Sequence, residues 1–287
     1  MTILDDIKWQ YKTGGMANKI IYWNVGAFLI SIPLFFHFNE YVFDYPTWIA
    51  LTSNWHQVLY FPYTLVTYSF LHAGFWHLFF NMMMLQFASR LFLTFFTQKQ
   101  LVGLYILSGI FAGLCFVGVS YFMGIESNLV GASGAIMGVL VATTTYQPLM
   151  GVRLFLFGAV KLWHVTGVIL LLFLLQIGVD NTGGHIAHFG GAFFGFFYIK
   201  LLQNGTDLSI WISKVMDFFV TLFQPKKKTP FKSVHVNYKK PNTTPKSSII
   251  LKDKQQQQVD EILDKISKSG YDSLTTEEKE FLFKSGK

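Results

Sequence analysis

The chain has 287 residues, of which 52% are hydrophobic and only 14% are charged, and its mean hydropathy is +0.38. This composition excludes an ordinary soluble domain and places most of the chain in a lipid bilayer. The charge is distributed unevenly along the chain. Residues 225–287 hold 14 of the 23 Lys and Arg and 8 of the 16 Asp and Glu, so their net charge is +6, and the rest of the chain has a net charge of +1. A single cysteine, Cys115, excludes an intramolecular disulfide and a cysteine-based metal site.

Six stretches are apolar and close to the roughly 20 residues that a membrane-spanning helix needs. They are residues 20–38, 75–96, 101–123, 133–150, 156–179 and 185–202. The sequence therefore predicts an all-α, polytopic membrane protein. Its membrane domain of six transmembrane helices covers residues 20–203 and follows a short segment, residues 1–19.

Basic residues indicate the orientation of these spans. They precede the first span, flank the second and fourth connections, and open the tail: Lys8, Lys12, Lys19, Arg90, Lys99, Arg153, Lys161, Lys226, Lys227 and Lys228. The other connections, residues 39–74, 124–132 and 180–184, contain no Lys or Arg. By the positive-inside rule both termini are cytoplasmic. The long first connection is rich in Trp and Tyr, which predicts a structured loop partly in the outer interface, with a solvated loop as the alternative.

The second span carries two polar side chains that lie on one helical face. His77 and Asn81 are four residues apart, and His72 comes shortly before them. Polar groups inside a membrane are costly, so they mark either a functional site or a hydrogen bond between helices. The pair by itself does not decide between these alternatives.

The fourth span begins with a small-residue segment, residues 131–138, that contains Ser133. A serine at a helix N-terminus lies beside unpaired N–H groups and the positive end of the helix dipole, which favour a developing oxyanion. Gly134 and Gly138 form a G-x-x-x-G pattern, so helix packing is the alternative interpretation.

The sixth span begins with two histidines, His185 and His188, followed by a second G-x-x-x-G pattern at Gly191 and Gly195. Small faces on spans 4 and 6 would let their backbones approach closely and bring His188 to Ser133. A neutral imidazole is suited to take the proton of a serine and to return it to a leaving amine. The alternatives for the two histidines are a metal site or a pair of packing residues, and no acidic or cysteine ligand lies nearby in the membrane to complete a metal site.

These clusters, in this order and on these spans, resemble the rhomboid family over roughly residues 15–203. The matching residues are His72, His77 and Asn81 (H-x-x-x-x-H-x-x-x-N), Gly131, Ser133, Gly134 and Gly138 (G-x-S-G-x-x-x-G), and His188, Gly191 and Gly195 (H-x-x-G-x-x-x-G). The resemblance implies an intramembrane serine endopeptidase without metal or cofactor, located in a bacterial cytoplasmic membrane. Its substrates would be transmembrane proteins cut in or near their membrane segments.

The resemblance also implies roles for individual residues. Ser133 would be the nucleophile and His188 the base of a dyad, while His77 and Asn81 would stabilise the oxyanion. The supporting residues would be Gly131, Gly134, Met137, His185, Gly191 and Gly195. Two departures stand out: Met137 replaces the aromatic residue that packs on the base in the family, and the first external loop lacks the family's Trp-Arg pair.

Two non-enzymatic functions compete with this interpretation. A rhomboid-like adaptor that binds membrane helices would be expected to have lost Ser133 or His188, and both are present. A transporter would need polar groups continuing to the inner side, whereas those found here cluster at the outer ends of the spans.

The polar tail divides into three parts. Residues 204–224 predict an amphipathic helix in the membrane interface, with a seventh span as the alternative. Residues 225–254 predict a basic, Pro- and Lys-rich linker against anionic lipid, and nothing besides charge suggests nucleic acid. Residues 255–287 predict a small helical cytosolic element, with a stop at Gly270 and a capping box of Thr275 and Glu278. We expect this element to be a docking or regulatory element, and the sequence does not identify its partner.

Overall fold

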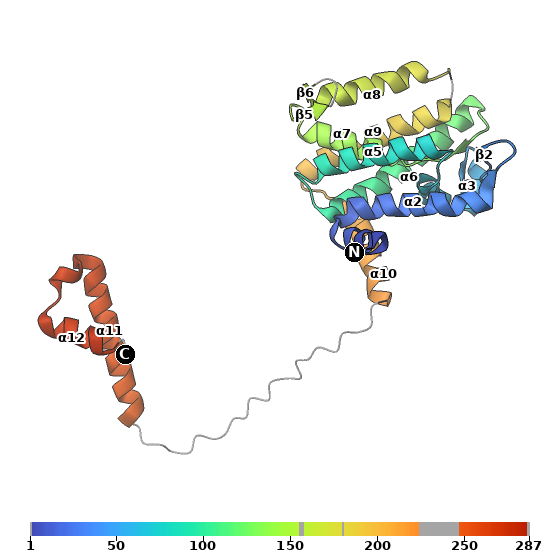
Figure 1. Ribbon diagram of the computed structural model, residues 1–287. Coiled ribbons are helices and arrows are strands. Elements are labelled where there is room, and N and C mark those ends of the chain that lie inside the picture. The colour runs from blue at the N-terminus through green and yellow to red at the C-terminus, as the bar shows by residue number, and fades with distance from the viewer. Residues whose placement is uncertain (1, 155–157, 180, 224–246, 286–287) are drawn as a thin grey trace. The chain divides into compact units, whose positions relative to one another are not determined.

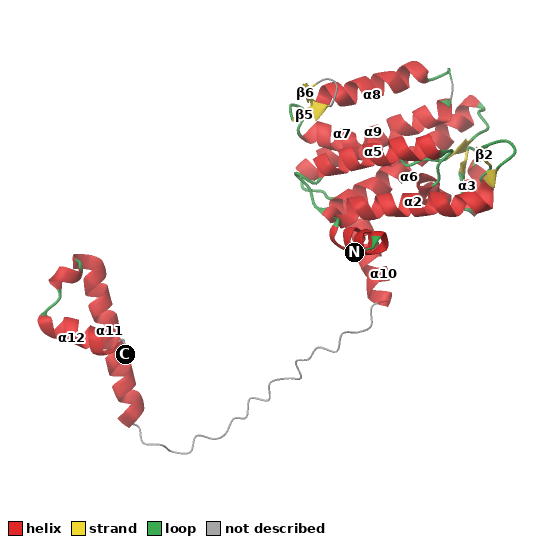
Figure 2. Ribbon diagram, in the orientation of Figure 1, coloured by secondary structure: helices red, strands yellow, loops and turns green. Residues whose placement is uncertain are grey.

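The computed structural model describes residues 2–154, 158–179, 181–223 and 247–285. The chain divides into two compact units, Met1–Pro225 and Lys226–Lys287. Helices dominate both units (Figures 1 and 2), which confirms the prediction of a mostly helical protein.

The elements of the first unit follow one another in this order. Its helices are α1 (Ile3–Thr13), α2 (Gly15–Phe35), α3 (Trp55–Tyr60), α4 (Thr64–Thr67), the 3-10 helix η1 (Tyr68–Phe70), α5 (Phe75–Phe92), α6 (Gln98–Met123), α7 (Ser133–Tyr146), α8 (Leu162–Gln176), α9 (Thr182–Gln203) and α10 (Ser209–Phe223). Its strands form three short antiparallel pairs: β1 (Phe36–His37) with β2 (Val42–Phe43), β3 (Leu51–Thr52) with β4 (Asn128–Leu129), and β5 (Gly151–Leu154) with β6 (Gly158–Lys161).

Helix α7 lies at the centre of the bundle, in contact with α5, α6 and α9 (Figure 1). Its residues from Gly134 to Leu140 are all buried, so this helix is apolar or small on every side. Helix α8 lies at the edge and buries only Leu162 and Thr166. A helix that is apolar all round and mostly uncovered by protein is typical of one that contacts lipid.

Helices α7 and α9 approach each other through their glycines. A Cβ atom on Gly191 would overlap the carbonyl oxygen of Gly134, and one on Gly195 would overlap that of Gly138. Because only glycine permits this spacing, the two G-x-x-x-G patterns are packing surfaces for each other, as predicted from the sequence.

Several predicted helix ends need correction. Span 4, predicted to reach residue 150, ends at Tyr146, because the residue before Pro148 is disfavoured in a helix. Span 5, predicted from residue 156, begins at Leu162, because the chain before it pairs with itself as the β5–β6 hairpin and Gly158 has a φ of +69°. Spans 1 and 2 likewise end early, at Phe35 and Phe92.

The helix lengths bear on the predicted spans. Within the described residues, α6 is the one helix long and apolar enough to cross a membrane, judged by length and composition alone. The apolar helices α7 and α8 have 14 and 15 residues. The six spans therefore stay a prediction.

The segment of residues 1–19, for which no helix was predicted, contains α1 and the start of α2. Helix α1 opens with a capping box in which Thr2 Oγ1 accepts from the backbone N–H of Asp5, and the Asp5 side chain accepts from Thr2. Its apolar side chains Leu4, Ile7 and Trp9 are exposed. An exposed apolar face next to charged residues is typical of a helix at a membrane surface.

The second unit is a helical hairpin of α11 (Ser247–Ser269), the 3-10 helix η2 (Tyr271–Ser273) and α12 (Thr276–Ser285). The predicted stop and capping box are confirmed: Gly270 has a φ of +77°, Thr275 N donates to Glu278 Oε2 at 2.8 Å, and Glu278 N donates to Thr275 Oγ1 at 3.3 Å. The predicted linker is too long, because residues 247–254 belong to α11. The rest of the predicted linker, residues 225–246, lies outside the described residues.

Candidate active site

Ser133 is the first residue of α7 and is partly buried. The chain reaches it through Gly131, whose φ of +128° is a conformation that favours glycine. Gly131 N donates to the carbonyl oxygen of Tyr68 at 3.0 Å, which ties this turn to η1. The Ser133 backbone N–H belongs to the first turn of α7, where amide groups lack partners within the helix.

His188 of α9 contacts this serine. His188 Nε2 lies 2.6 Å from Ser133 Oγ, a hydrogen bond whose donor depends on the imidazole tautomer. The two residues are 55 positions apart in the chain, and the glycine contact between α7 and α9 is what brings them together. His188 Nδ1 is buried and has no hydrogen-bond partner among the described residues.

An aromatic ring from α8 packs on this imidazole. The ring centroids of Phe173 and His188 are 4.0 Å apart, at an interplanar angle of 33°. Phe173 also lies 5.7 Å from the ring of His185. Phe173 therefore makes the aromatic contact with the base that Met137 cannot make. Met137 itself is buried and lines one cavity together with Phe173 and His188. Sequence reasoning missed Phe173, because it is one apolar residue in an apolar span.

His77 and Asn81 of α5 face the serine from the other side. Ala73 N donates to His77 Nδ1 at 3.2 Å, so the neutral ring carries its proton on Nε2 and can donate from there. A Cβ atom on Gly131 would lie 3.0 Å from His77 Nε2 and 3.7 Å from Ser133 Oγ, so both groups flank Gly131. Asn81 Nδ2 donates to the His77 carbonyl oxygen at 2.8 Å.

A cavity of about 360 Å³, called here the dyad pocket, joins these residues. Its lining includes Ser133, His188, His77, Asn81, Met137 and Phe173. The remaining predicted residues lie around it: Gly131, Gly134, Gly191 and Gly195 set the backbone spacing, and His185 packs beside His188 with 5.8 Å between ring centroids. All of the predicted site residues therefore gather in or around one pocket.

His72 lies outside the dyad pocket although it belongs to the same sequence motif. It is fully buried, and its ring centroid is 5.2 Å from that of His77. Burial, followed by the neighbouring His77, lowers the pKa of His72 to about 3.

A comparison with protein families identifies the family of the chain. A family model described as the Rhomboid domain matches residues 61–204, which are 144 of the 287 residues. The chain belongs to the rhomboid family. Rhomboids are a family of intramembrane proteases, so this rhomboid is an integral membrane protein built as a helical bundle. The match confirms the resemblance on which the predicted residue roles depend.

A second family model covers most of the helical hairpin. A family of unknown function (DUF6576) matches residues 250–284. A search of curated proteins gave no match. The rhomboid unit and the C-terminal unit thus match two different families, in agreement with the division of the chain into two units.

Proposed function

We propose that this rhomboid is an active serine endopeptidase that hydrolyses peptide bonds in or near the transmembrane segments of other proteins. The observation that carries the proposal is the 2.6 Å contact between Ser133 Oγ and His188 Nε2 inside the dyad pocket. A serine hydroxyl is a weak nucleophile until a neighbouring base takes its proton, and this contact supplies the base.

The first chemical step is attack by Ser133 Oγ on the carbonyl carbon of the substrate, while its proton passes to His188 Nε2. The tetrahedral intermediate then collapses, the C–N bond breaks, and His188 returns the proton to the leaving amine. A water molecule hydrolyses the acyl-enzyme with the same base. No described carboxylate contacts His188 Nδ1, which fits a dyad rather than a triad.

The oxyanion of the intermediate needs hydrogen-bond donors on the side away from His188. The Ser133 backbone N–H, His77 Nε2 and the Asn81 amide can provide them, because His77 and Asn81 line the same pocket. One such donor is typically worth ~10²–10³ in rate. The Asn81 amide has two N–H bonds, and only one is engaged with the His77 carbonyl.

The proposed membrane arrangement has six spans, α2, α5, α6, α7, α8 and α9, with both termini in the cytoplasm of a bacterial cell. The ends of the bundle support it: the connections beside the dyad pocket lack Lys and Arg, and the opposite end carries Arg90, Lys99 and Arg153. Helix α10 lies in the interface at that end, where Lys99 and Asp217 form an ion pair of 2.9 Å. The C-terminal hairpin is a docking or regulatory element.

Cleavage of a reconstituted single-span substrate with a glycine-containing outer segment tests the proposal. We expect the wild type to cut it, and Ser133→Ala and His188→Ala each to abolish cutting. His164→Ala, an exposed histidine at the start of α8, is the control and should cut normally. Cleavage by Ser133→Ala would show that Ser133 is not the nucleophile. If the wild type fails to cut several such substrates, the non-enzymatic adaptor that binds membrane helices is favoured.

A further inference from the structure

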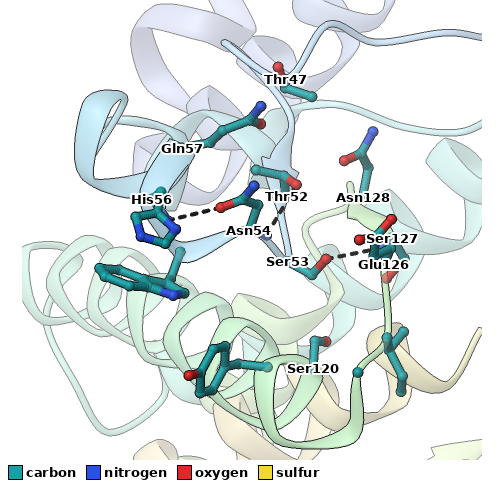
Figure 3. A pocket seen from close by; sticks show the side chains of 14 residues that line it. Thr47, Thr52, Ser53, Asn54, His56, Gln57, Ser120, Glu126, Ser127 and Asn128 are labelled. Atoms are coloured by element: carbon teal, nitrogen blue, oxygen red, sulfur yellow. Dashed lines mark hydrogen bonds between the residues drawn. The ribbon is translucent and has the colours of Figure 1, made fainter.

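A second cavity lies at the same end of the bundle as the dyad pocket. It has a volume of about 620 Å³, and we call it the loop pocket. Its lining comes from the first long connection, the end of α6 and the segment before α7: Thr47, Thr52, Ser53, Asn54, Trp55, His56, Gln57, Ser120, Tyr121, Gly124, Ile125, Glu126, Ser127 and Asn128. Figure 3 shows side chains of residues 47–57 on one side facing those of residues 126–128 on the other.

The lining is dominated by hydroxyl and amide groups. Such side chains both donate and accept hydrogen bonds, so they suit a ligand with an alternating pattern of donors and acceptors, such as a polypeptide backbone. Two buried atoms of the lining, Ser120 Oγ and Gln57 Oε1, have no partner among the described residues. Ser120 itself is fully buried.

The two walls of the loop pocket are joined by backbone pairing and hydrogen bonds. Strands β3 and β4 pair, with Thr52 opposite Asn128, and Ser53 N donates to the Ser127 carbonyl oxygen at 3.0 Å. Ser127 N in turn donates to Ser53 Oγ at 3.1 Å. A site that is formed before its ligand arrives loses less entropy on binding.

The charge of the loop pocket favours one class of ligand. Glu126 is the one carboxylate in the lining, and the lining contains no Lys or Arg. The connections at this end of the bundle, residues 39–74, 124–132 and 180–184, also lack Lys and Arg. Clefts lined by a single sign of charge concentrate ligands of the opposite sign.

Strand β4 connects the loop pocket with the dyad pocket. Asn128 lines the former, and the next residue, Leu129, lines the latter. Successive residues of a strand point to opposite faces, so the two pockets lie on the two sides of one strand. The same segment continues through Val130 to Ser133. A substrate chain that follows this segment away from Ser133 would bring its flanking residues beside the loop pocket.

We propose that the loop pocket binds the polar segment flanking the transmembrane helix of the substrate, and that it prefers a segment with Lys or Arg over one with Asp or Glu. This inference rests on the proposed function. The flanking segment supplies backbone donors and acceptors for the hydroxyl and amide lining, and a basic side chain for Glu126. The loop pocket thereby selects substrates by sequence outside the bond that is cut.

The test uses three single-span substrates that differ only in three flanking residues, which are Lys, Gln or Glu. In detergent micelles the wild type should show a KM about threefold lower for the Lys substrate than for the Glu substrate, since an exposed ion pair is weak. The kcat values should agree, because the scissile segment is shared. Glu126→Gln should bring the KM ratio close to 1, and Glu126→Lys should invert it.

Glu40→Gln is the matched control, because Glu40 is an exposed acid of the first long connection, residues 39–74, that does not line the loop pocket. It should keep the ratio of the wild type. An unchanged ratio in Glu126→Gln, or an equal loss in Glu40→Gln, would overturn the inference. Cleavage that still requires Ser133 would then leave the proposed protease function standing, so the two failures are distinguishable.

Cross-linking locates the segment directly. In a Ser133→Ala background, Thr47→Cys should form a disulfide with a cysteine in the substrate flank, and Glu40→Cys should not. The one native cysteine, Cys115, lies within α6 and does not line the loop pocket. Equal cross-linking from positions 40 and 47 would contradict a bound flank, as would its absence from position 47.

Discussion

At the scale of single residues, the proposed base must be held in place without help from a carboxylate. His188 Nδ1 has no described hydrogen-bond partner, so the orientation of the imidazole depends on its bond to Ser133 and on packing. Phe173 covers the imidazole ring at 4.0 Å, and His185 lies beside it. We infer that Phe173 is a positioning residue for the base.

Replacing this ring should slow the chemical step. Phe173→Leu keeps the residue apolar but removes the ring face, and we expect kcat to fall about tenfold with little change in KM, since misplacing a catalytic group by a fraction of an ångström is costly. Phe173→Tyr should restore most of the activity. Phe193→Leu, at an exposed site on α9 outside the dyad pocket, should have no effect. Equal losses in both leucine variants would contradict the positioning role.

Substitution of the proposed oxyanion donors should affect kcat rather than KM. His77→Ala and Asn81→Ala should each lower kcat by ~10²–10³ while KM stays nearly unchanged, because the oxyanion forms only after the substrate is bound. Steady-state kinetics with the single-span substrate would check this. A rise in KM at constant kcat would assign these side chains to substrate binding instead.

The sequence shows some site residues more clearly than others. Ser133 and His188 were predictable because each precedes a glycine pattern, and polar residues are rare in apolar spans. Phe173 was not predictable, because the Leu-rich span around it offers no pattern that separates one apolar residue from the next. Its role comes from the contact between α8 and α9, which only tertiary structure reveals.

At the scale of elements, the closeness of α7 and α9 determines whether the dyad forms. Gly191→Ala would drive a Cβ atom into the carbonyl oxygen of Gly134 and push the helices apart. Overpacking of this kind costs about 1–3 kcal/mol, or roughly 2–10 °C in Tm. Thermal unfolding in detergent and the cleavage assay should both show the loss.

Gly167→Ala provides the control for this change. Gly167 lies in α8, where an added Cβ would meet nothing within 4 Å. The same substitution there should leave cleavage intact and raise stability by up to about 1 kcal/mol, because alanine favours helices. A comparable loss in both variants would show that the α7–α9 contact is not the sensitive element.

The start of α10 predicts a pH dependence of stability. Asp207 accepts hydrogen bonds from Ser209 N at 2.8 Å and from Gln100 Nε2 and Tyr198 Oη at 3.1 Å. Burial by itself would raise the pKa of Asp207, but these hydrogen bonds outweigh it and hold the pKa below the usual 3.8. The stabilisation is therefore fully present above pH 3.8 and is lost as the pH falls through the lower folded-state value.

Asp207→Asn should lower the Tm at pH 7, and its difference from the wild type should shrink below about pH 4 as the wild-type carboxylate is protonated. The exposed Asp6→Asn serves as the control and should change little. Melting curves in detergent at pH 7 and pH 3 would measure both. A difference that grows at low pH would contradict the assigned sign.

Sequence patterns located the long helices better than their ends. Strand β6 was taken for part of span 5 because its residues are mostly apolar, and strand pairing depends on a partner segment, here β5, that periodicity does not show. Helix α1 was overlooked because its apolar residues alternate with charges and never form a long run. The loop pocket was also unforeseen, since its walls come from residues about 70 positions apart.

At the scale of the whole molecule, the proposed chemistry belongs to one unit. All residues of the dyad pocket and of the loop pocket lie within Met1–Pro225. A chain of residues 1–225 should therefore cleave the single-span substrate in detergent with a kcat/KM within about twofold of the full chain, because a compact unit with its own core can fold by itself. A large loss would assign the C-terminal hairpin a direct part in activity.

The proposed function depends on the activation of Ser133 as a nucleophile by His188. The most direct measurement is covalent labelling of the purified protein with a fluorophosphonate, followed by mass spectrometry of the labelled peptide. We expect one adduct, on Ser133, that disappears in His188→Ala although the serine is still present. An adduct that persists in Ser133→Ala, or labelling of Ser133 that does not depend on His188, would contradict it.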